Sequence, residues 1–225
     1  MLVLLLDTSS AAVTAGVGEV GDGHCRVLSE RSLVDGKKHG EALAPLITAC
    51  LEAVGRTPAD LGAVVAGVGP GPFTGLRVGL VTAAAFADAL RVPAYGVCSL
   101  DALAAAVADD GPPFLVATDA RRREVYWAVY GGTGERLTEP AVSRPAAVAE
   151  AAAEWGARRG VGAGARLYAD VLGLPVAAPD HPDASSLLSL AAARVAADAP
   201  TEALTPLYLR RPDAVEPAAR KSVLG

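Results

Sequence analysis

The stretch Gly67-Val68-Gly69-Pro70-Gly71-Pro72-Phe73-Thr74-Gly75-Leu76-Arg77 joins a short apolar run to a long apolar helix. The apolar run, residues 63–68, predicts a buried strand, and the helix is expected to begin near Thr74 and to end at Leu90. Glycines at a strand-to-helix junction let the backbone approach another group closely, either a phosphate or another chain. The choice between these two partners decides what the sequence predicts about function.

Strands and helices alternate on both sides of this junction. Residues 2–6 form a continuous apolar run, which favours a strand covered on both faces. A turn at residues 18–23 is expected to join two further strands into a hairpin. The remaining predicted strands cover residues 12–17, 26–33, 93–97, 114–118 and 124–130. The first predicted helix begins after Gly36 and ends before Gly55. The other predicted helices cover residues 74–90, 100–108, 145–155, 166–172 and 185–197. This order predicts an α/β layer architecture.

The chain has 225 residues, enough for one large domain or two small ones. The segment Asp109-Asp110-Gly111-Pro112-Pro113 is the best boundary candidate, and it divides the chain into lobes of residues 1–108 and 109–225. The apolar start at residues 1–6 is too short to span a membrane. The sequence therefore predicts two lobes and no membrane association.

The formal net charge is −5, which argues against a protein whose own surface grips nucleic acid. The clusters Arg121-Arg122-Arg123 and Arg210-Arg211 are exceptions, and solvated turns are the favoured interpretation for both. The three cysteines are far apart and predict buried free thiols in a reducing cytosol: Cys25, Cys50 and Cys98.

Asp7-Thr8-Ser9 closes the first strand, where a carboxylate and a phosphate-cradling turn stand in many nucleotide-binding domains. Such a turn normally needs glycine so that backbone N–H groups converge on the anion, and none is present here. A vestigial nucleotide contact and a purely structural role remain open. His39 has Leu43 one turn later in place of a second histidine, so no metal site is predicted.

The helix after the junction carries Gly75, Gly79, Ala83 and Ala87 at intervals of four residues. Small side chains at this spacing let a second helix approach closely. Packing inside the domain against its own sheet is the alternative. Because the helix is apolar on several faces, a partner subunit is a natural cover for the face that the sheet leaves free.

These motifs together resemble the TsaB (YeaZ) family. The resemblance rests on residues 5–9, His39-Gly40-Glu41 and the junction 69–77, and it is dense up to about residue 130. Further matching segments are Tyr95-Gly96-Val97-Cys98-Ser99-Leu100, Asp119-Ala120-Arg121, Glu124-Val125-Tyr126, Gly162-Ala163-Gly164-Ala165 and Pro206-Leu207-Tyr208-Leu209-Arg210. Pro72 departs from the pattern, since a serine is frequent there, and this weakens a phosphate-binding role for the loop.

The resemblance implies an actin-like ATPase (ribonuclease H-like) fold with a reduced second lobe. It also implies a non-catalytic, cytoplasmic subunit needed to make threonylcarbamoyladenosine next to the anticodon of tRNA. The implied partners are a TsaD-like transferase and a TsaE-like ATPase, with tRNA reached through the complex and a homodimer as a further state. ATP and metal are expected on the partners and no cofactor on this chain alone.

The resemblance further implies that partners dock on two helices of the first lobe. The predicted interface residues are Leu43, Ile47, Cys50, Leu51, Gly75, Gly79, Ala83 and Phe86. Two enzymatic alternatives stay open: a metal-dependent hydrolase or transferase, which needs metal ligands, and a small-molecule kinase of the same fold, which needs a working phosphate turn.

Overall fold

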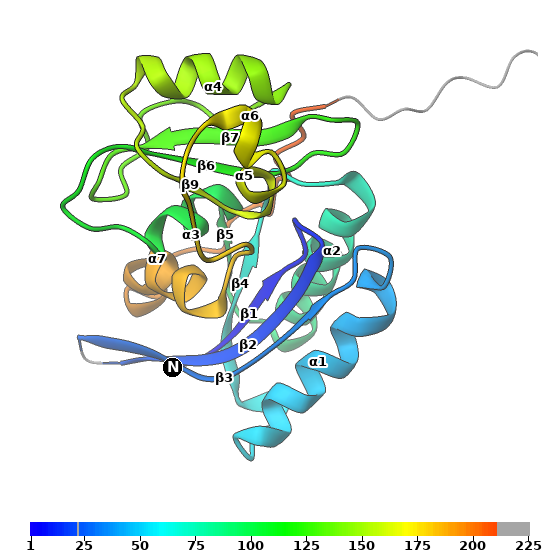
Figure 1. Ribbon diagram of the computed structural model, residues 1–225. Helices are drawn as coiled ribbons and strands as arrows, with labels where there is room; N and C mark the ends of the chain where they lie inside the picture. Colours follow the sequence, from blue (N-terminus) through cyan, green and yellow to red (C-terminus); the bar gives the residue numbers. More distant parts are fainter. Residues whose placement is uncertain (22, 211–225) are drawn as a thin grey trace, which may run out of the picture.

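Two five-stranded sheets form the frame of the molecule (Figure 1). The computed structural model describes residues 1–21 and 23–210. Sheet 1 has the strand order β3-β2-β1-β4-β5 and sheet 2 the order β10-β9-β6-β7-β8. The strands of sheet 1 are β1 (Leu2–Asp7), β2 (Ala12–Gly21), β3 (His24–Val34), β4 (Leu61–Gly67) and β5 (Ala94–Val97). Those of sheet 2 are β6 (Phe114–Asp119), β7 (Val125–Tyr130), β8 (Ala141–Ser143), β9 (Gly160–Val161) and β10 (Val176–Ala177).

Strand β1 is the central strand of sheet 1. It pairs antiparallel with β2 and parallel with β4, and its residues 3–6 are fully buried, as the continuous apolar run predicts. Alternate side chains enter different cores, because Leu4 and Leu6 belong to one apolar cluster and Val3 and Leu5 to another. Both faces of sheet 1 are therefore covered.

The hairpin β2–β3 is longer than predicted. Strand β2 continues to Gly21, which pairs with His24, so the expectation of a turn beginning at residue 18 is wrong. Val20 is buried in the core beside α7, and this packing keeps the strand extended past its glycines.

Four helices cover sheet 1. Helices α1 (His39–Ala53) and α2 (Phe73–Leu90) pack side by side on one face, while α3 (Ser99–Ala105) and α7 (Ala184–Ala196) lie on the other (Figure 1). A short 3₁₀ helix, Pro58–Asp60, leads into β4.

Helix α3 also packs on sheet 2, through Leu100 and Leu103 against Phe114 and Val116. It therefore lies between the two sheets and joins the lobes. The remaining helices accompany sheet 2 and are α4 (Pro145–Glu154), α5 (Ala163–Leu167) and α6 (Ala169–Leu172).

The predicted second lobe, residues 109–225, does not pack as one unit. Helix α7 returns to sheet 1, where it contacts β2, β3, β4 and β5. The chain then continues without regular structure as a strap, residues 199–210, in which the Leu207 N–H donates to the carbonyl of Val68. Arg210 reaches the carbonyl of Ala120 in the second lobe. Arg211 lies outside the described residues.

Helix α2 is unusually apolar for a helix of a layered α/β fold. Its 18 residues have a mean hydropathy of 1.3, so it is long and apolar enough by composition to cross a membrane. Core helices meet the same criterion, and α2 buries Gly75, Leu76, Gly79 and Leu80 against sheet 1. We therefore treat α2 as a core helix.

Candidate functional site

The turn after β1 is built around a buried carboxylate. Asp7 is 1% exposed, and its Oδ1 accepts hydrogen bonds from the Ser9 N–H (2.9 Å) and the Ser9 hydroxyl (2.8 Å). Its Oδ2 accepts one from the hydroxyl of Ser99 (2.6 Å). Burial raises the pKa of the Asp7 carboxyl above its ordinary value, although the bonds from Ser99 and Ser9 lower it. Both carboxylate oxygens are thus occupied by this chain's own groups.

Thr8 connects this turn to helix α2. Its hydroxyl donates to the carbonyl of Gly75 (2.8 Å) and accepts from the N–H of Gly79 (3.0 Å). These two backbone groups lie one helical turn apart, where they would ordinarily bond to each other. The Thr8 side chain is 1% exposed, so its hydroxyl holds the end of β1 against α2 in the core.

The glycines of the junction leave room for the β1 turn. A methyl group on Gly71 would lie 2.2 Å from the carbonyl oxygen of Ser9, and one on Gly79 would lie 2.3 Å from the Thr8 hydroxyl. A methyl group on Gly67 would meet the Asp7 carboxylate. The close approach that these glycines permit is therefore to the chain's own β1 turn.

The residues predicted to face a partner lie mostly on the inner sides of the two helices. Those buried against sheet 1 are Leu43, Ile47, Cys50, Leu51, Gly75, Gly79 and Ala83. Phe86 is partly buried beside the same core. The spacing of these residues identified the helices and their apolar faces correctly, but that face is the one that the sheet covers. We therefore correct the prediction that these residues are exposed contacts: they are buried or partly buried core residues.

The outward faces of α1 and α2 consist of small and uncharged residues along their middle turns. We call the exposed set Ala44, Pro45, Thr48, Val81 and Ala85 the outer face. Val81 is 67% exposed, the most of any large apolar side chain among the described residues. The exposed charges of α2, Arg77 and Asp88, flank this uncharged stretch.

His39, the first residue of α1, is buried and structural. Its Nε2 donates to the carbonyl of Ser10 (2.8 Å), which ties the start of α1 to the β1–β2 connection. Within residues 1–21 and 23–210, His, Cys, Asp and Glu side chains form no group of three or more that could hold a metal ion.

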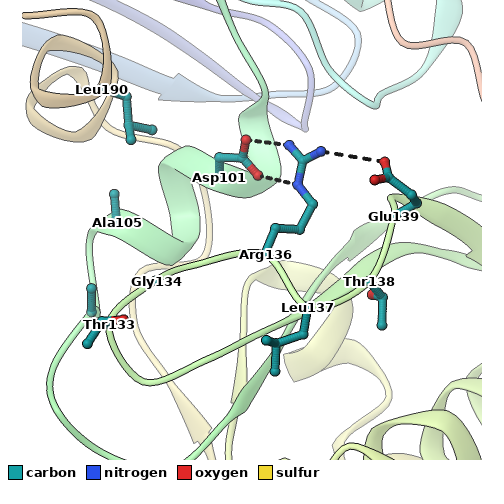
Figure 2. Close-up of a pocket in the computed structure, with 10 residues that line it drawn as sticks. Asp101, Ala105, Thr133, Gly134, Arg136, Leu137, Thr138, Glu139 and Leu190 are labelled. Atoms are coloured by element: carbon teal, nitrogen blue, oxygen red, sulfur yellow. Dashed lines mark hydrogen bonds and ion pairs between the residues drawn. The ribbon is translucent and has the colours of Figure 1, made fainter. Parts of the chain in front are cut away.

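A cavity of about 580 Å³ lies beside α3 (Figure 2). Its charged side chains are paired with one another: the Arg136 guanidinium donates to the Asp101 carboxylate through Nε (3.0 Å) and Nη2, and its Nη1 lies 3.7 Å from Glu139. The Tyr130 hydroxyl donates to Asp101 as well (2.7 Å). These contacts fix the segment after β7 to α3 and pair the charged groups of the cavity.

Two features of this region had no signal in the sequence. The Ser99 hydroxyl donates to Asp7, 92 residues away, and accepts from the N–H of Gly69 (3.2 Å). The strap places the Tyr208 ring 5.0 Å from that of Phe73 at the start of α2. Contacts across such separations follow from topology and leave no periodic pattern.

Known proteins resemble the chain in sequence and in fold. The model of the TsaD family, tRNA N6-adenosine threonylcarbamoyltransferase, matches residues 27–160. An uncharacterized protein of Mycobacterium tuberculosis is 48% identical over 212 residues, or 94% of this chain and 93% of that protein. The tRNA threonylcarbamoyladenosine biosynthesis protein TsaB of Escherichia coli is 30% identical over 132 residues, which span 58% of this chain and 55% of that protein.

The structure of YeaZ from Pseudomonas aeruginosa superposes with a TM-score of 0.73 at 30% identity and covers 92% of this chain and 99% of that one. This likeness confirms the ribonuclease H-like α/β fold that the sequence motifs imply. The chain therefore belongs to the TsaB (YeaZ) family and shares the family model of the threonylcarbamoyltransferase TsaD.

Proposed function

We propose that this chain takes part in threonylcarbamoyladenosine modification of tRNA as a non-catalytic subunit that docks on a TsaD-type transferase. The names of the Escherichia coli and Bacillus subtilis relatives, tRNA threonylcarbamoyladenosine biosynthesis protein TsaB, support the pathway. The subunit holds the partner's lobes in a productive arrangement. It contributes a coupling free energy between the two subunits and carries out no chemical step itself.

The outer face of α1 and α2 is the observation that carries this proposal. Side chains as small as Ala44 and Ala85 let a partner's helices approach closely, and Val81 supplies an exposed apolar contact. A partner helix pair can bury this face without desolvating a charge, because the exposed charges lie at its ends. A second copy of this chain could occupy the same face, so a homodimer would compete with the transferase.

The hydrogen bonds and close packing of the β1 turn support the non-catalytic role. Asp7 is buried and saturated by Ser9 and Ser99, and Gly71 and Gly79 place the backbone of the junction directly against this turn. These contacts support a structural role for Asp7, Thr8 and Ser9 and argue against a small-molecule kinase.

We place the remaining functions on the partners. In this proposal ATP binds to a TsaE-like ATPase and metal to the TsaD-like subunit, and tRNA is reached through the cytoplasmic complex. This chain needs no cofactor of its own.

The docking proposal is tested by placing a charge on the outer face. Val81→Glu should weaken binding to the TsaD-type homologue from the same organism at least thirtyfold, about 2 kcal/mol, because the partner would bury an unpaired carboxylate. Calorimetric titration measures the affinity. Leu190→Glu, which changes a 40% exposed leucine on α7 across the sheet, is the matched control. Equal affinity of Val81→Glu and the wild type would refute docking on this face.

A further inference from the structure

A second cavity lies between the lobes at the start of α2. Its volume is about 330 Å³. Three segments that are distant in sequence line it: the first turn of α2 with Phe73 and Thr74, the β6–β7 turn with Arg121 and Arg122, and the strap with Tyr208 and Arg210. The cavity therefore depends on the tertiary arrangement of both lobes.

Among the described residues, the charged side chains that line the cavity are all arginines: Arg121, Arg122 and Arg210. A neighbouring hollow of about 360 Å³ shares Arg121 and the start of α2 and adds Lys37 and His39, and the described residues that line it include no carboxylate either. In a chain with a net charge of −5 these two hollows bring four cationic side chains together, of which Arg121 and Arg210 are paired with Asp119 and Glu124.

The Arg121 side chain remains accessible to a ligand. It is 60% exposed, and its Nη1 is 3.4 Å from the Asp119 carboxylate, longer than a well-formed charged hydrogen bond. Arg210, in contrast, is held by Glu124 and by the carbonyl of Ala120. Arg121 is thus the cation best able to exchange its present contact for an anion. Arg210 instead holds the strap against the second lobe.

Two aromatic rings stand at the same cavity. Phe73 and Tyr208 are 37% and 38% exposed, and their ring centroids are 5.0 Å apart. Arg77 lies over the Phe73 ring at 4.2 Å and its Nε donates to the Tyr208 hydroxyl (3.2 Å), which fixes both rings. Exposed rings next to arginines are suited to stacking a base while the cations meet its phosphate.

We propose that this cavity binds a nucleotide phosphate through Arg121 and Arg122, with Phe73 and Tyr208 beside the base. The nucleotide can come from RNA or be free in solution. For the RNA source, the inference extends the proposed function: this chain itself would contact the tRNA backbone at a place separate from the outer face that docks the transferase.

The test uses the full chain and two probes. An unmodified, end-labelled tRNA transcript is titrated by fluorescence anisotropy at several salt concentrations, and ATP is titrated by calorimetry. Replacing both arginines, Arg121→Gln with Arg122→Gln, should weaken binding of the responsive probe at least tenfold. For RNA, the slope of log affinity against log salt should become shallower by about 0.7 for each lost contact.

The matched control, Arg56→Gln with Arg158→Gln, removes two exposed arginines elsewhere and should leave binding near the wild-type value. Arg121→Lys with Arg122→Lys keeps the charge and should restore most of the affinity. Loss with RNA alone assigns the site to RNA, and loss with ATP alone assigns it to a free nucleotide. No loss with either probe, or an equal loss in the control, overturns the proposal. The glutamine pair should still bind the TsaD-type partner, so failure of docking and failure of this site are distinguishable.

Discussion

Gly79→Ala tests why helix α2 carries glycines. The added methyl group would lie 2.3 Å from the Thr8 hydroxyl, closer than nonbonded atoms approach. Thr8 cannot move away freely, because its hydroxyl bonds to the carbonyl of Gly75 and to the N–H of residue 79 itself. The substitution therefore strains the β1 turn and breaks both hydrogen bonds.

The expected magnitude follows from three effects. Overpacking a well-filled core costs about 1–3 kcal/mol. Loss of two buried hydrogen bonds adds about 0.5–1.5 kcal/mol each. The better helix propensity of alanine returns about 1 kcal/mol. The free energy of unfolding should therefore fall by about 1–5 kcal/mol, and each kcal/mol lowers the melting temperature by about 2–4 °C for a chain of this size.

Urea denaturation followed by far-UV circular dichroism measures the change. Gly40→Ala is the matched control, since Gly40 lies in α1 with open space where a side chain would project, and it should be neutral or slightly stabilising. Adding Thr8→Ala to Gly79→Ala removes the clash, so the double variant should be more stable than the sum of the two single effects predicts.

The reasoning is refuted if Gly79→Ala is as stable as the wild type. It is also refuted if the two single effects simply add, because the methyl group and the Thr8 side chain would then not meet.

Two further predictions concern ionisable groups. Because burial raises the pKa of the Asp7 carboxyl, the folded chain holds this proton more tightly than the unfolded chain does. Stability should therefore fall as the pH rises from the ordinary carboxyl pKa through the raised one, and Asp7→Asn should remove that part of the fall in urea titrations repeated along the pH scale. Burial also raises the pKa of the Cys98 thiol to about 11 and raises that of Cys50, whereas Cys25 is exposed. A thiol reagent at about pH 8 should therefore label Cys25 alone in the native chain and all three cysteines after unfolding, and rapid native labelling of the partly buried Cys98 would contradict its raised pKa.

The strands and helices of sheet 1 could largely be predicted from the sequence, because their patterns are local. Residues 2–6 are apolar without interruption since both faces of β1 are covered, and the helix ending near Gly55 shows helical spacing with a glycine just past its last turn. The short strands β8, β9 and β10 were missed, because two or three residues contain no period.

The site was harder to predict, since a periodic pattern identifies the buried side of a helix as readily as a docking side. The small residues of α2 were compatible with a partner helix and with packing inside the domain, and only tertiary contacts such as the one between Thr8 and Gly79 distinguish the two. Arg121 and Tyr208, 87 positions apart in the sequence, line one cavity because the strap crosses from one lobe to the other. No local feature of the sequence encodes that crossing.

Hydroxyl-radical footprinting of this chain, alone and bound to its TsaD-type homologue, tests the docking account most directly. We predict that oxidation of Pro45 and Val81 falls in the complex, while Trp155 and Leu167 of the second lobe, which are 47% and 60% exposed, react as before. Unchanged oxidation of Val81 together with protection of Trp155 and Leu167 would place the partner on the other lobe and contradict the account.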